Sequence, residues 1–137
     1  MATFKSEKVT INTTSKSLFD FLSNLNNLEG LMPLDKISEW QSTETECSFK
    51  IPNLGKIGFK HDTFTEPSQI KLVSLSDKPF GFSMDFNITE NGDSTSAQII
   101  VDANLNPMLK MMVEKPLTAF FNGIAKKLAN NRFSLTN

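Results

Sequence analysis

Residues 80–105 read FGFSMDFNITENGDSTSAQIIVDANL, and apolar and polar side chains alternate on both sides of a central Asn91-Gly92. Alternation with a period of two is typical of strands with one buried face, and Asn-Gly accepts the positive φ angles of a tight hairpin. We therefore predict antiparallel strands at 80–90 and 94–105, each with one dry and one wet face. The dry faces carry Phe82, Met84, Phe86 and Ile88 in the first strand and Ala97, Ile99, Val101, Ala103 and Leu105 in the second.

The period of two continues upstream of this hairpin, where turn signals separate short apolar runs. Residues 52–55 (PNLG) and 66–68 (EPS) are two such signals. A looser alternation opens the chain. These patterns predict further strands at 3–11, 36–42, 45–51, 56–66 and 69–76.

Apolar residues recur at spacings of three and four in two other parts of the chain, which is the pattern of amphipathic helices. The first part follows Thr13, Thr14 and Ser15, all good N-cap types, and predicts a helix of about ten residues and then a short helical piece at 28–31. The second part predicts a long helix at 108–133. Pro116 falls inside it, so we expect a break or kink at 114–116, with Pro116 starting the main helix. The apolar stripe of this helix consists of Val113, Leu117, Phe120, Phe121, Ile124 and Leu128.

The chain has 137 residues, of which 39% are hydrophobic, and this predicts one domain over residues 1–137 with a core of its own. The order of one strand, two short helices, six strands and a long helix places the helices on one side of an antiparallel sheet. We therefore predict an α+β fold. In it, a curved sheet of six or seven strands wraps around the long C-terminal helix.

The composition excludes several classes of function. A net charge of −1 argues against nucleic-acid binding, which needs clustered positive charge. One cysteine and one histidine cannot form a disulfide, a Cys/His zinc site or a His triad, and we expect no metal and no cofactor. No apolar run has the length of a signal peptide or of a membrane span, so the expected location is the cytoplasm.

The order of elements resembles the Bet v 1-like superfamily of helix-grip proteins, which includes START-domain lipid carriers and the polyketide cyclase/dehydrase group. The resemblance extends over about 3–133 and rests on the opening strand, the first helix SKSLFDFL (15–22), the second-helix region 24–32 and the long final helix. The family's Trp-Pro stretch is replaced by MPL at 32–34. The resemblance implies a cavity between sheet and long helix that binds lipids, sterols, aromatic polyketides or other apolar molecules. It also implies ring closure or hydrolysis in some members, and it brings no universal catalytic residue.

We therefore expect a cytoplasmic protein that binds a hydrophobic or aromatic small molecule in such a cavity, where burial of apolar surface supplies the affinity. Two alternatives stay open. One is a cyclase/dehydrase-type enzyme with His61 as acid or base, and the other is an interaction module with a filled core. The expected ligand-binding residues are Phe59, His61, Phe82, Met84, Phe86, Ile99, Val101, Leu117, Phe120, Phe121 and Ile124.

His61 is the best single candidate for a polar group that orients the ligand, because it is in phase with Phe59 on the expected inner face. Phe64 also favours the inner side, which demands a bulge between residues 59 and 64. After such a bulge, His61 would be an ordinary hydrogen-bonded or outward-facing residue.

Three methionines, Met108, Met111 and Met112, begin the long helix. Methionine adapts to irregular pockets, and these residues precede the expected kink, so residues 106–115 form a candidate mobile lid at the mouth of the cavity. Ordinary core filling is the alternative. Cys47, in phase with Phe49, is expected to be a small apolar residue of the core.

Overall fold

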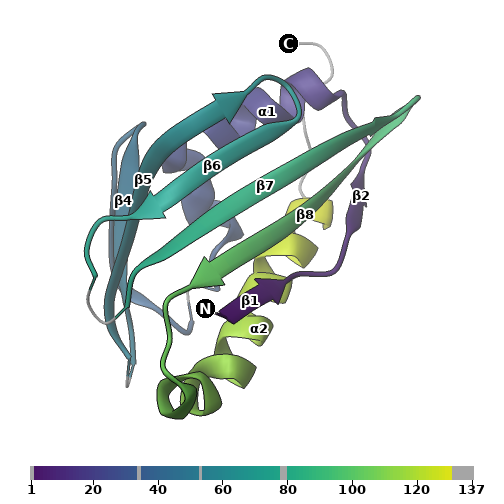
Figure 1. The fold of residues 1–137 in the computed structure, drawn as a ribbon. Helices are drawn as coiled ribbons and strands as arrows, with labels where there is room; N and C mark the ends of the chain where they lie inside the picture. The colour runs from purple at the N-terminus through teal and green to yellow at the C-terminus, as the bar shows by residue number, and fades with distance from the viewer. Residues whose placement is uncertain (1, 34, 53, 78–79, 131–137) are drawn as a thin grey trace.

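The computed structural model describes residues 2–33, 35–52, 54–77 and 80–130. Within these residues, an antiparallel sheet curves around a long helix, as predicted (Figure 1). The strands are β1 (Ala2–Lys5), β2 (Val9–Ile11), β3 (Ser38–Ser42), β4 (Glu46–Ile51), β5 (Gly55–Thr65), β6 (Gln69–Ser74), β7 (Phe82–Asn91) and β8 (Ser94–Ala103). The helices are α1 (Ser15–Ser23), the 3-10 helix η1 (Leu25–Leu31) and α2 (Pro107–Asn130).

The strands follow the order β1-β8-β7-β6-β5-β4-β3, and β2 also pairs with β8. The predicted hairpin is confirmed, because β7 and β8 pair from Phe82↔Ala103 to Asn91↔Ser94 with Gly92 at a φ of 75° in the turn. Every residue of the two predicted dry faces is buried except Phe82, which is half-buried. This hairpin therefore forms the centre of the core on the concave side.

The first strand differs from the prediction of one strand at 3–11. It is interrupted at residues 6–8, and the resulting β1 and β2 both pair with β8. Ser6 holds the interruption: its N–H donates to the carbonyl of Ile99 at 2.9 Å, and its hydroxyl accepts from the N–H of Ile99 at 2.9 Å. The serine side chain thus satisfies a backbone donor that a continuous strand would have paired.

The two short helices follow β2 as predicted. The cap of α1 is Thr14, whose hydroxyl oxygen accepts from the N–H of Ser17 at 3.1 Å. In η1 the buried residues are Leu25, Leu28 and Leu31. Their spacing of three equals the three residues per turn of a 3-10 helix, so one edge of η1 faces the core along its whole length.

The long helix α2 runs without interruption from Pro107 to Asn130, so the predicted break at 114–116 is wrong and Pro116 does not start the helix. Proline removes the hydrogen bond to the residue four positions earlier, which here is Met112. Met112 is 68% exposed, so water reaches this turn and can satisfy the freed carbonyl. The first turns of α2 project past the end of the sheet (Figure 1). The predicted end at 133 lies outside the described residues.

Polar contacts fasten α2 to the rest of the fold. The ammonium of Lys127 donates to the carbonyl of Met32, at the end of η1, over 2.6 Å. The N–H of Glu7 donates to Oδ1 of Asn122 at 2.8 Å. In the described ranges, no helix has the length and apolar character needed to cross a membrane.

Candidate ligand-binding site

A small cavity lies between the sheet and α2, among the phenylalanines of the core. Its volume is about 20 Å³, which is room for roughly one water molecule. The protein's own side chains therefore nearly fill the space in which a ligand was expected. The lining is apolar throughout and consists of Phe49, Ile51, Ile57, Phe59, Phe80, Phe82, Val101, Leu117, Phe120 and Phe121.

A larger groove of about 300 Å³ opens where the β4–β5 hairpin meets the first half of α2. Ile51, Leu117 and Phe120 line both this groove and the small cavity, so they form the wall between the two spaces. Of the described residues that line the groove, Lys36 is the one that carries a charge. The remaining lining residues are Pro52, Leu54, Leu109, Met112, Val113, Pro116 and Ala119.

Stacked aromatic rings connect the wall of the groove to the edge of the sheet. Phe120 stacks on Phe49 with ring centroids 5.7 Å apart and an interplanar angle of 24°. Phe49 stacks in turn on Trp40, at 5.7 Å and 14°. Because the chain has one tryptophan and no tyrosine, its fluorescence comes from Trp40 and is sensitive to changes in this stack.

The predicted ligand-binding residues fall into three groups in the structure. One group lines the small cavity, a second is packed solidly in the core, and His61 lies apart from both. The first group consists of Phe59, Phe82, Val101, Leu117, Phe120 and Phe121. The second consists of Met84, Phe86, Ile99 and Ile124, which are each 1% exposed.

His61 lies on β5 opposite Leu72. The register of β5 against β6 shifts between His61 and Thr63, which confirms the predicted bulge. The imidazole contacts Phe64 with ring centroids 4.4 Å apart, and Phe64 contacts Phe19 of α1 at 5.7 Å. Its Nε2 is buried and has no hydrogen-bond partner in the part of the chain that the structure describes. His61 therefore packs among aromatic rings, outside the lining of the groove.

Sequence reasoning missed most of the groove, since much of its wall comes from a turn and from residues of α2 outside the predicted stripe. Pro52 and Leu54 belong to the turn after β4, whereas Leu109 and Met112 belong to the first turns of α2. The core-filling alternative for Met108, Met111 and Met112 is wrong, because these residues are 74%, 83% and 68% exposed. The sequence did contain one signal for the groove, namely apolar residues of the long helix that lie outside its apolar stripe.

Cys47 is a core residue, as predicted, with 2% of its surface exposed. Burial raises the pKa of its thiol to about 12, partly opposed by a hydrogen bond to the backbone of Phe59. At pH 8 only about one thiol in ten thousand is then ionised.

We expect the native protein to resist alkylation by N-ethylmaleimide at pH 8, because the thiolate is the reactive species. Mass spectrometry would measure the modified fraction over time, with urea-unfolded protein as the rapidly modified reference. Fast labelling of the folded chain would contradict the buried position of Cys47.

Acidic residues gather on the outer face of the sheet. Burial raises the pKa of Asp85 above its ordinary value, and the charges of Asp102 and Asp62 raise it further, whereas Lys71 on β6 opposes the shift. Asp102 also accepts a hydrogen bond from the hydroxyl of Thr3 at 2.7 Å. No group of three His, Cys, Asp or Glu side chains within the described residues is placed to hold a metal ion.

Comparison with known proteins gives a fold rather than a sequence relative. No family model matches the sequence, and no curated protein matches it. Solved structures, by contrast, match nearly its whole length. The protein XoxI from Bacillus cereus is 11% identical with a TM-score of 0.71, and the match covers 95% of this chain and 94% of that one. A START superfamily protein from Mycobacterium smegmatis is 16% identical with a TM-score of 0.65, over 93% of this chain and 94% of that one.

Norcoclaurine synthase from Thalictrum flavum, in complex with dopamine and hydroxybenzaldehyde, is a third similar structure. It is 13% identical with a TM-score of 0.64, and the match covers 97% of this chain and 90% of that one. At such identities the shared property is the fold. The chain therefore has the predicted α+β helix-grip fold of the Bet v 1 and START type.

Proposed function

We propose that this protein binds a hydrophobic or aromatic small molecule in the groove between the β4–β5 hairpin and α2. The observation that carries the proposal is the apolar lining of this groove and its volume of about 300 Å³. Ligand pockets have this character, with a predominantly apolar wall and a few polar groups that fix orientation. Burial of a ligand there would supply about 25 cal/mol per Å² of apolar surface. The aromatic molecules bound in the similar norcoclaurine synthase structure support an aromatic ligand class.

Lys36 favours those apolar ligands that also carry an acidic group. Among the described residues of the lining, its side chain is the one with a charge, and it is exposed. An ammonium attracts a carboxylate, sulfonate or phosphate, whereas it gains nothing from a hydrocarbon. We therefore propose that the ligand is an apolar or aromatic molecule with one acidic group, which lies near Lys36.

The ligand site can extend from the groove into the small cavity, whose lining includes the predicted ligand-binding residues Phe59 and Phe82. The half-buried side chain of Phe120 lies in the wall between groove and cavity. If its ring turns aside, the groove and the cavity become one space bounded by Phe59 and Phe82. We propose that a bound aromatic ring takes the place of the Phe120 ring against Phe49.

The nearly filled interior favours a second candidate, an interaction module whose groove accepts an apolar side chain of a partner. A cavity of about 20 Å³ holds no drug-sized molecule, so a closed interior site has little support. The enzyme alternative has less support. The buried Nε2 of His61 has no hydrogen-bond partner among the described residues, and an acid–base residue needs a group to orient it.

The test is a titration of freshly purified protein with anilinonaphthalene sulfonate, an aromatic molecule with one negative charge. We expect saturable binding that changes the fluorescence of Trp40, which is stacked through Phe49 onto the wall of the groove. Leu54→Asp should weaken this binding at least about tenfold, since a carboxylate in the groove removes apolar contact and repels the sulfonate.

Leu75→Asp is the matched control, because Leu75 is 42% exposed and lies outside the lining of the groove. This variant should keep the affinity of the original protein. Native mass spectrometry of the same preparation would identify a co-purified apolar molecule. Equal probe affinity in both variants, or no probe binding and no co-purified molecule, would refute the ligand site and favour the interaction module.

A further inference from the structure

The first turns of α2 carry an apolar patch that no other described residue covers. Met108, Met111 and Met112 are 74%, 83% and 68% exposed. At 100° per residue, these three side chains share one side of the helix with Lys115. We call the three residues the methionine tip. Proteins in water seldom expose large apolar side chains together, and such a patch indicates a docking surface.

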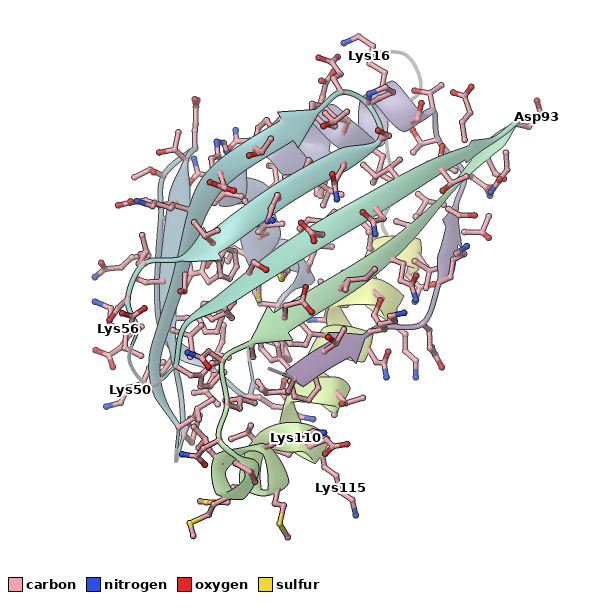
Figure 2. All side chains as sticks on the ribbon, viewed as in Figure 1. Lys16, Lys50, Lys56, Asp93, Lys110 and Lys115 are labelled. Atoms are coloured by element: carbon pink, nitrogen blue, oxygen red, sulfur yellow. The ribbon has the colours of Figure 1, made fainter. Side chains whose placement is uncertain are left out.

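Lysines lie near the methionine tip. Lys115 shares the side of α2 that carries the methionines, Lys110 lies on the other side of the same turns, and Lys50 and Lys56 lie on the neighbouring β4–β5 hairpin. Figure 2 shows Lys110 and Lys115 at the end of the molecule where α2 begins, and Lys50 and Lys56 along the flank of the β4–β5 hairpin. Lys36 is the charged residue of the groove that adjoins the tip. All five side chains are exposed.

The lysines of the hairpin repel each other. Lys50 and Lys56 are direct cross-strand partners, and like charges in that position destabilise a sheet. Glu39, 3.9 Å from Lys50, offsets part of this repulsion. Asp35 and Glu114 are next to Lys36 and Lys115 in the sequence, and together with Glu39 they place three negative charges beside the five lysines. A negatively charged partner would relieve the repulsion, which indicates the chemistry of what this surface meets.

We propose that the methionine tip docks on an anionic membrane surface. The methionines enter the boundary between headgroups and acyl chains, and the nearby lysines contact lipid phosphates and carboxylates. Apolar side chains flanked by lysines are the pattern of surface-bound, non-spanning membrane contacts, and each lysine adds attraction to anionic lipid. Docking needs no bound ligand and goes beyond the small-molecule site. Because the groove opens beside the tip, docking also gives an apolar ligand a path that avoids water.

The test is co-sedimentation of the whole chain with phosphatidylcholine vesicles, with and without about one-third phosphatidylserine. We expect binding to the anionic vesicles that is at least about tenfold tighter than to the neutral ones and that weakens with salt. Met111→Asp should weaken binding to anionic vesicles at least about tenfold, because it places a carboxylate at the point of insertion. Lys110→Glu combined with Lys115→Glu should have a similar effect.

A matched control is Lys8→Glu combined with Lys60→Glu, which makes the same change in net charge at exposed lysines away from the tip. It should keep vesicle affinity within about twofold. Met111→Gln, a neutral change at an exposed position, preserves the test if the aspartate variant misfolds. Equal vesicle binding by the tip variants and the control would overturn the proposal. So would a dimer that Met111→Asp disrupts in a protein without vesicle binding, since the tip would then join two copies of the chain.

Discussion

Phe49→Ala should lower the free energy of unfolding by about 3–5 kcal/mol. Phe49 is 1% exposed, and its ring contacts three other aromatic rings. Alanine would remove the contacts with Trp40, Phe59 and Phe120 together and leave a void that the curved sheet cannot close. The loss therefore combines the transfer of a large apolar side chain with the cost of the cavity.

Urea unfolding followed by circular dichroism and by the fluorescence of Trp40 would measure this loss. Phe49→Leu should cost less, because leucine fills part of the volume. Phe64→Ala is a comparison at a ring that is 37% exposed, and it should cost about 1 kcal/mol or less. Similar losses at Phe49 and Phe64 would mean that the aromatic stack does not stabilise the core.

Phe120→Ala should tighten the binding of anilinonaphthalene sulfonate about tenfold. The substitution removes the half-buried ring that separates the groove from the small cavity, so the two spaces join. About 60 Å² of additional buried apolar surface corresponds to about 1.5 kcal/mol, which is roughly tenfold in affinity. Fluorescence titration of the variant and the original protein would measure the change.

Phe121→Ala is the control for this prediction. Phe121 is 8% exposed and lines the cavity but not the groove, so its removal does not join the two spaces. The variant should lose stability without gaining affinity for the probe. Equal gains in both variants would point to a loosened core that takes up the probe anywhere. No gain in Phe120→Ala would mean that its ring does not limit the ligand site.

The sheet could be predicted from the sequence because its information is local. In β7 and β8 every second residue is apolar, and the turn between them needs only the backbone freedom of Gly92. The bulge after His61 was also accessible, because Phe59 and Phe64 cannot both face inward on a regular strand. The 3.6-residue period likewise located α1 and α2.

The remaining features depend on partners that are distant in sequence. The interruption of the first strand depends on Ser6, whose hydroxyl accepts a hydrogen bond from the N–H of Ile99. The alternation of apolar and polar side chains in the sequence does not predict that bond. The continuity of α2 across Pro116 depends on the exposure of the turn that holds Met112, which the helical period alone does not reveal. Both features follow from solvation and hydrogen bonding in the assembled fold.

The candidate site was predictable only where it coincides with the inner faces of regular elements. Leu117 and Phe120 belong to the apolar stripe of α2 and do line the groove. Leu54 and Leu109 come from a turn and from the start of a helix, and only the packing of α2 against the β4–β5 hairpin brings them together. The sequence also could not predict that side chains nearly fill the interior, since this depends on how their volumes pack in three dimensions.

The pairing of the first strand with the last sets the order in which this chain can fold. Contacts between β1 and β8 run from Ala2↔Ala103 to Lys5↔Ile100, so one edge of the sheet closes only when segments far apart in the chain meet. Loop-closure entropy makes such long-range pairing slow compared with the formation of local hairpins. During synthesis, residues 2–5 must wait unpaired until β8 has been made, whereas β7 and β8 can pair as soon as both are present. The strand that begins the chain is thus among the last to take its place.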